Sequence, residues 1–220
     1  MTTAAARKPF EWVGGVPALD FTNTVTWIGD GLINERLATF VDLVEWGREA
    51  GFLTARTAEG LDRVGRAQPE LAGRTLERAH RLRRVLHDVF VAVASGGEAD
   101  PAGIERLNRF LENALAHLTL QPDGDRWSWT WRQEVGDLDQ VLRPVAWSAA
   151  QLLTSPDRAL LKHCAGHQCG WVFLDRSRNH ARRWCDMKVC GNNEKARRFY
   201  RSHRSQVTGR RSQDDVTGGL

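Results

Sequence analysis

Four cysteines near the carboxyl terminus have the spacing expected of metal ligands. Cys164, Cys169, Cys185 and Cys190 form the pattern C-x4-C-x15-C-x4-C, and the sequence contains no other cysteine. Two short knuckles joined by a longer arm can bring four thiolates around one Zn2+, and four sulfur ligands leave the metal no open position. The pattern therefore predicts one structural zinc ion that holds a small fold together.

Two disulfides, free buried thiols and a thiol redox switch are the other interpretations of these cysteines. Disulfides suit an exported chain, but residues 1–17 lack the continuous apolar run of a signal peptide, and no segment reaches the length of a membrane span. A thioredoxin-like pair would need C-x-x-C, whereas both gaps here are four residues long. We therefore expect a cytoplasmic protein with reduced thiols that bind zinc.

The positive charge of the chain is concentrated around the cysteines. The whole sequence has a formal net charge of +4, but residues 157–211 hold 14 Lys and Arg against four Asp and Glu. Residues 1–156 hold 17 against 21, although they share the same preference for arginine over lysine. Compositional bias therefore does not explain the asymmetry, which favours a polyanionic partner for the cysteine-containing end.

The part of the chain before the cysteines has the periodicity of a helical domain. Apolar residues at helical spacing predict four main helices, over residues 35–50, 70–95, 101–117 and 138–153. Pro144 is expected to interrupt or bend the last of these. A short helix is expected over residues 157–163, leading into the first cysteine.

Between two of these helices the apolar period changes from helical spacing to two. Residues 118–131 alternate around a Pro-Asp-Gly-Asp turn, which predicts a β-hairpin with Trp127, Trp129 and Trp131 on one face. The three rings could line a ligand pocket. Burial of this face against the helices is the simpler interpretation, and it is the one we expect.

Together these patterns predict a mainly α protein with a small β-hairpin, in two parts. A helical domain over residues 10–155, which would sense a ligand or dimerise, precedes a zinc-finger module over residues 156–204. Residues 205–220 are polar and Gly-rich, and we expect a disordered tail. Because the module is too small to bury a sufficient core, zinc should supply much of its folding free energy.

The arm between the two cysteine pairs would cover the metal. Trp171, Phe173 and Trp184 are the expected miniature core that excludes water from the zinc. Asp175 and Ser177 are expected to fix the arm through turn hydrogen bonds rather than to act in catalysis.

The residues after the last cysteine predict a helix with one cationic face. Asn192 or Asn193 would cap it, and Glu194 suits its first turn. At helical spacing Ala196, Phe199 and His203 share the opposite face, which we expect to pack on the zinc core.

A solvated basic face is the ordinary explanation of arginines on a helix. Here cations from the arm and the second knuckle would lie beside the same helix, and their sum favours salt-dependent phosphate binding. The asparagines at the helix start, or an arginine, could read a base edge. The candidate nucleic-acid contacts are Arg182, Arg183, Lys188, Asn192, Asn193, Lys195, Arg197, Arg198, Arg201 and Arg204.

These residues resemble a known family, the CGNR zinc finger of bacterial proteins. The matching features are C-x4-C, Phe173-x-Asp175-x-Ser177, Arg183-Trp184-Cys185, Met187 and Cys190-Gly191-Asn192. Upstream features look like the ABATE-type domain that precedes this finger, namely Leu19-Asp20-Phe21-Thr22-Asn23-Thr24, Trp46, Leu82-Arg83, Leu107-Asn108 and Ser148-Ala149-Ala150-x-Leu152-Leu153. The resemblance covers roughly residues 10–204.

The resemblance implies a stress-related transcriptional regulator whose finger binds zinc and DNA. One position departs from the name-giving motif, since Asn193 stands where Arg is usual. If that Arg touches phosphate, this chain lacks one contact, and if it is structural, the helix start is rearranged. Arg197 and Arg198 are placed to compensate.

The leading hypothesis is a DNA-binding regulator with a zinc finger. Its helical domain would take a small-molecule effector or form a homodimer, and we expect no membrane partner. The alternatives are an RNA-binding or protein-interaction module, and a redox sensor that ejects zinc when its thiolates are oxidised. An enzyme is not expected. The histidines are scattered, no Gly-rich phosphate loop is present, and a four-thiolate zinc has no position for water.

Overall fold

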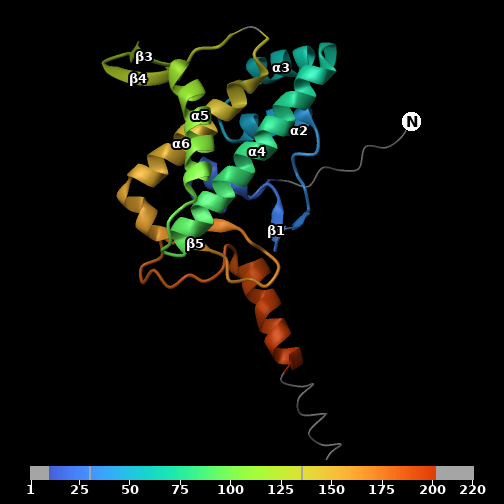
Figure 1. The fold of residues 1–220 in the computed structure, drawn as a ribbon, viewed down its shortest axis with the longest axis vertical. Coiled ribbons are helices and arrows are strands. Elements are labelled where there is room, and N and C mark those ends of the chain that lie inside the picture. Colours follow the sequence, from blue (N-terminus) through green and yellow to red (C-terminus); the bar gives the residue numbers. More distant parts are fainter. Residues whose placement is uncertain (1–9, 30, 135, 202–220) are drawn as a thin grey trace, which may run out of the picture.

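The computed structural model describes residues 10–29, 31–134 and 136–201, and within them the chain is mainly helical, as predicted (Figure 1). The α-helices are α1 (Pro17–Thr22), α2 (Phe40–Glu49), α3 (Ala55–Ala67), α4 (Pro69–Ala94), α5 (Pro101–Ala116) and α6 (Leu142–Thr154). The strands are β1 (Thr26–Ile28), β2 (Gly31–Ile33), β3 (Leu118–Asp123), β4 (Arg126–Trp131), β5 (Leu161–His163) and β6 (Val172–Leu174). The expected tail, residues 205–220, together with His203 and Arg204, lies outside the described residues.

The long helix α4 is the centre of the helical domain. It contacts α1, α2, α3, α5 and α6, and its carboxyl-terminal half also contacts β5 and β6. Leu82, Leu86 and Phe90 are fully buried on it and belong to one continuous core with Phe21 of α1 and Trp46 of α2. None of the described helices is long and apolar enough to cross a membrane.

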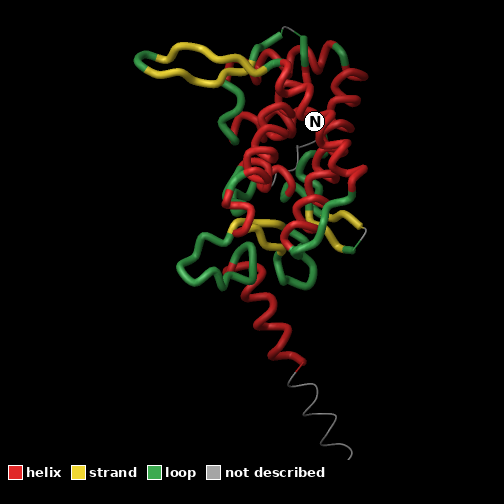
Figure 2. Tube along the Cα trace, turned by 60° about the vertical axis from the view of Figure 1, so that its left-hand side comes forward, coloured by secondary structure: helices red, strands yellow, loops and turns green. Residues whose placement is uncertain are grey.

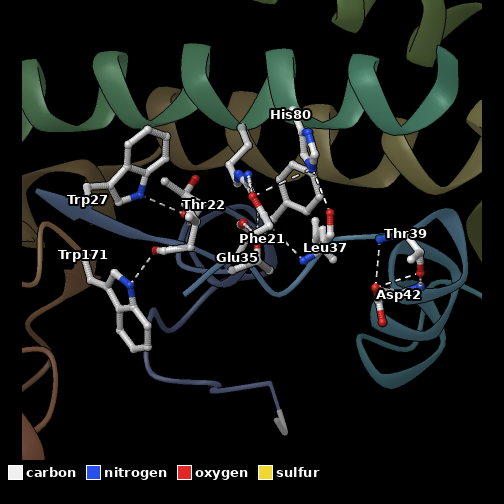
Figure 3. A network of polar contacts seen from close by, with 12 residues as sticks. Phe21, Thr22, Trp27, Glu35, Leu37, Thr39, Asp42, His80 and Trp171 are labelled. Atoms are coloured by element: carbon white, nitrogen blue, oxygen red, sulfur yellow. Dashed lines mark hydrogen bonds and ion pairs between the residues drawn. The ribbon is translucent and has the colours of Figure 1, made fainter. Parts of the chain in front are cut away.

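Local capping signals decide where α2 begins. The Thr39 hydroxyl accepts a hydrogen bond from the Asp42 amide at 3.2 Å, and the Asp42 carboxylate accepts one from the Thr39 amide at 2.8 Å (Figure 3). This reciprocal capping box starts the helix at Phe40, so the expected start at residue 35 was wrong. Leu37 is still buried, as expected, but it lies in the extended segment before the helix.

One helix, α3, was not predicted. Its buried side is formed by Ala58, Leu61 and Gly65, two of which are small residues. Gly65 is required there, because a Cβ atom at this position would lie 2.7 Å from a ring carbon of Phe40. The predicted helices at residues 70–95 and 101–117 are confirmed as α4 and α5.

The segment before the cysteines differs from the expected short helix over residues 157–163. A 3-10 turn, η2 (Pro156–Leu160), leads into β5, which pairs antiparallel with β6. The preceding helix is interrupted as expected, since a 3-10 turn, η1 (Leu138–Val141), precedes α6 and Pro144 lies in the first turn of that helix. A proline there removes no intrahelical hydrogen bond.

The β3–β4 hairpin forms as expected, but its apolar face is not buried. Trp129 pairs with Leu120 and Trp127 with Pro122, so the tryptophans share a face. Trp127 and Trp129 are 67% and 60% exposed, and the hairpin extends away from the helices (Figures 1 and 2). The expectation that this face packs on the helices was wrong because the strands run outward beyond the end of α5.

Candidate metal centre and basic helix

The structure brings the four cysteines together. Each Sγ atom lies within 4.8 Å of the others, and the Sγ of Cys185 lies 3.5 Å from that of Cys169 and 3.6 Å from that of Cys190. Four sulfur atoms at about 2.3 Å from a zinc ion would be about 3.8 Å apart at the corners of a tetrahedron. The cysteines, which form no disulfide, therefore fit one zinc ion.

Hydrogen bonds to the sulfur of Cys164 favour the thiolate of that residue. The Cys164 Sγ accepts from the amides of Gly166 at 3.5 Å and Cys185 at 3.3 Å. Hydrogen bonds from the thiols of Cys169 and Cys185 lower the pKa of Cys164 to about 2, and the same bond raises the pKa of Cys169. Zinc binding would displace the protons of the remaining thiols.

The second knuckle has a backbone turn that fits it closely. In the second knuckle the Asp186 carboxylate accepts from the amides of Lys188 and Val189, at 2.5 and 3.0 Å, and starts a π-helical turn, η3 (Met187–Gly191). A Cβ atom at Gly191 would lie 2.4 Å from the Met187 sulfur. A larger residue directly after Cys190 would therefore require the Met187 side chain to move.

Asp175 fixes the arm between the knuckles, as the sequence predicts. Its buried carboxylate accepts from Lys162 Nζ at 2.7 Å, from the Ser177 amide at 3.0 Å and from the Arg182 amide at 2.8 Å. Burial raises the pKa of the Asp175 carboxyl, but the hydrogen bonds from Lys162, Ser177 and Arg182 lower it by more. The net result is a pKa below the usual range. Asp175, directly after β6, thus ties β5 and two segments of the arm to one anion.

The covering of the cysteines comes partly from the other end of the chain. Trp171 and Phe173 are buried beside Cys164, Cys169 and Cys185, as predicted, and Trp184 is half-buried. Val25 and Trp27, from the segment around β1, complete this cluster. The indole nitrogen of Trp171 donates to the Val25 carbonyl at 2.8 Å, and that of Trp27 donates to Thr22 at 3.1 Å (Figure 3).

The hairpin β5–β6 is joined to the helical domain by further buried contacts. Asn23 donates to the Val172 carbonyl at 2.9 Å and accepts from the Val172 amide at 3.1 Å, so its side chain pairs with the edge of β6. Leu161, Val172 and Leu174 belong to the main core. The zinc site is therefore built on the helical domain as well as on its own knuckles.

Helix α4 reaches the cysteines through His87. Its imidazole stacks on Trp27 at 3.8 Å between ring centroids, and its Nε2 donates to the Gly170 carbonyl at 3.0 Å. Burial lowers the pKa of His87, which favours the neutral ring. Gly170 has φ +66°, and a Cβ atom there would lie 2.5 Å from the Trp27 Cβ, so the chain beside Cys169 approaches β1 as closely as glycine allows.

The candidate nucleic-acid residues divide into two groups. Arg182 faces inward, where its Nε donates to the Trp184 carbonyl at 2.9 Å and its guanidinium lies 4.3 Å from the Phe173 ring centroid. It stabilises the second knuckle. The others are exposed or, for Arg197, half-buried on the zinc module and its helix, and those described are Arg183, Lys188, Asn192, Asn193, Lys195, Arg197, Arg198 and Arg201.

The basic helix starts earlier than expected and extends into solvent. It continues from η3 through residues 192–201, with Asp186 rather than an asparagine as its cap. Phe199 is 57% exposed and Ala196 is exposed, so the expected packing of this face on the zinc core was wrong. The helix leaves the cysteines at the buried Gly191 and projects away from the rest of the structure (Figures 1 and 2).

Glu194 anchors the start of this helix to the first knuckle. Its carboxylate accepts from the His167 amide at 3.0 Å, and this hydrogen bond lowers the pKa of Glu194. Asn193, at the position where an arginine is usual in the resembling family, borders a cleft of about 200 Å3 together with Arg36 and Cys190. The helix is therefore held in a defined direction relative to the zinc site.

Several contributors to the site were missed by sequence reasoning. Asn23, Trp27 and His87 lie far from the cysteines in sequence, and no local periodicity marks them. The signal that could have found Asn23 is its place in the Thr-Asn-Thr segment after α1, where a buried polar side chain requires a partner.

A helical domain that carries a four-cysteine site and a basic helix defines a zinc-finger protein with an amino-terminal helical domain. Residues 15–156 match the family model ABATE, described as "Putative stress-induced transcription regulator", and residues 161–203 match the CGNR zinc finger. The first match covers more than half of the chain, which therefore belongs to the ABATE family and carries a CGNR zinc finger, as the sequence motifs predicted. No curated protein matches the chain.

Proposed function

We propose that this protein is a cytoplasmic, DNA-binding transcriptional regulator of a stress response, and that it binds its partners without acting as an enzyme. The observation that carries the proposal is the exposed basic helix, which the zinc knuckles hold in a fixed direction. Residues 192–201 contain Lys195, Arg197, Arg198 and Arg201 against one acidic residue, Glu194. Membership in a family of transcription regulators supports the same conclusion.

Contacts to phosphate would come from the exposed cations of the finger. Arg183 and Lys188, on the arm and the second knuckle, add to the charge of the helix. Each phosphate neutralised releases counterions, so the logarithm of the binding constant should fall with the logarithm of salt concentration by about 0.9 per contact. Arg182 would contribute only indirectly, by holding the second knuckle.

A fluorescence-anisotropy titration of labelled duplex DNA at several salt concentrations tests this proposal. Replacing Lys195 and Arg198 by Gln should weaken binding about tenfold and flatten the salt slope by about two contacts. The matched control replaces Arg56 and Arg74, exposed on α3 and α4, by Gln. Equal loss in both variants would contradict a specific role for the basic helix. If the protein bound single-stranded RNA of the same length more tightly than duplex DNA, RNA rather than DNA would be its partner.

We also propose a homodimer formed through the β3–β4 hairpin. Exposed aromatic side chains on a protruding element are common at protein interfaces, and Leu120, Trp127 and Trp129 form such a surface. Light scattering after size exclusion should give a mass of two chains, and of one chain for the Trp127→Ser/Trp129→Ser variant. A monomeric wild-type protein at micromolar concentration would refute this interface.

A further inference from the structure

A cavity of about 550 Å3 lies between α4, α5 and the residues where η1 continues into α6. Its volume is in the range of small-molecule binding sites. Val85, Phe110 and Leu142 supply apolar wall. The rest of the lining is unusual in its charge, because six arginines border the cavity, namely Arg78, Arg81, Arg84, Arg106, Arg109 and Arg143.

The cavity has an excess of positive charge. Two carboxylates border it, and one of them, Asp139, is already bound by Arg78 at 2.7 Å. The other, Asp88, is 58% exposed. Arg81, Arg106 and Arg109 pair with acidic residues in exposed ion pairs, and such pairs contribute little. Guanidinium groups bind carboxylate or phosphate through charge-assisted hydrogen bonds, which are stronger than neutral ones.

Arg143 gives a second, independent indication of an anionic ligand. Its side chain is 3% exposed and lines the cavity. Nη2 binds Asp137, and Nε donates to Asn113 at 3.3 Å, but Nη1 is buried and has no hydrogen-bond partner among the described residues. Buried donors are rarely left unpaired. A ligand acceptor would remove this cost once the side chains that cover Nη1 shift, because this atom has almost no accessible surface.

We propose that this cavity binds a small organic anion, with its charged group on the arginines and its apolar body against Val85, Phe110 and Leu142. Arg84 connects the cavity to the zinc site, because its guanidinium also lies 4.6 Å from the Trp27 ring centroid. Trp27 in turn covers the cysteines. The ligand would act as an effector through this contact, a role that rests on the proposed DNA-binding function, whereas binding itself does not.

Fluorescence titration with 8-anilinonaphthalene-1-sulfonate tests the site, because this probe joins an anionic group to an aromatic body. N-phenyl-1-naphthylamine, which has the same body without the charge, is the matched ligand. The titrations use the full chain with Trp127→Ser and Trp129→Ser, so that the exposed hairpin does not bind the probes.

The Arg81→Gln/Arg106→Gln variant removes two cavity arginines that are 61% and 49% exposed, so its folding should be unaffected. It should bind the anionic probe about tenfold more weakly and the neutral probe with nearly unchanged affinity. The Arg56→Gln/Arg74→Gln control should bind both probes like the parent. Absence of saturable binding, equal weakening for both probes, or equal weakening in the control would overturn the proposal.

The effector role is tested separately from the site. These titrations contain no DNA, so failure of the DNA-binding proposal would leave their result valid. If duplex DNA binds, adding the anionic probe should shift its affinity in the parent protein and not in the Arg81→Gln/Arg106→Gln variant. An affinity that does not change in either protein would overturn the effector role alone.

Discussion

Replacing Asn23 should strongly destabilise the attachment of the zinc module to the helical domain. Its side chain is 2% exposed and satisfies both the amide and the carbonyl of Val172, which is fully buried. Asn23→Ala would leave two buried backbone groups unpaired, at about 1–3 kcal/mol each. The expected loss is therefore about 2–6 kcal/mol, a large part of the roughly 5–15 kcal/mol that stabilises a folded domain.

Thermal unfolding of the zinc-loaded protein measures this loss. For a chain of this size about 2–4 °C is lost per kcal/mol, so the midpoint should fall by roughly 4–24 °C. Zinc release to a chromogenic chelator should also be faster, because Val172 lies on the strand that follows Cys169. Asn108→Ala on the exposed side of α5 is the control, with a change within about 0.5 kcal/mol. A midpoint no lower than that of the control would refute the reasoning.

Two further substitutions test other parts of the structure. Gly170→Ala should lose about 2–4 kcal/mol in urea unfolding, since it adds a clash with Trp27 to the strain of φ +66°. Gly96→Ala, at φ +72° with nothing within 4 Å, should show the strain alone, about 1–2 kcal/mol, and equal losses would rule out the clash. Burial raises the pKa of Asp20 from 3.8 to about 6, so the folded state binds this proton more tightly than the unfolded state and wild-type stability falls as the pH rises from about 4 to 6. Asp20→Asn should remove up to about 3 kcal/mol of this fall, measured by urea unfolding at pH 4 and pH 7, and an identical pH dependence in the two proteins would contradict the assignment.

The zinc site was predictable because its ligands are close in sequence. Two C-x4-C knuckles define the donor set without any knowledge of the fold, and Asp175 follows from the same local logic. The support from Asn23 and Trp27 could not be predicted in this way. These residues contact a segment more than 140 positions away, and only tertiary structure brings the two segments together.

Periodicity predicted which side chains share a face, but not what covers that face. The tryptophans of the β3–β4 hairpin share a face as expected and yet remain exposed. Phe199 shows the same limit on the basic helix. The positive charge of an arginine likewise does not show whether its side chain is structural or exposed. Arg182 binds carbonyl groups of the second knuckle, whereas Arg183 beside it is exposed.

X-ray absorption at the zinc edge of the purified protein, with the metal quantified in the same sample, tests the central claim most directly. We predict one zinc ion per chain with four sulfur neighbours at about 2.3 Å and no oxygen or nitrogen neighbour. The Cys185→Ser variant should lose most of the metal or show a mixed shell. Less than a stoichiometric amount of zinc in the wild-type protein, or a shell containing nitrogen or oxygen, would contradict the four-thiolate centre.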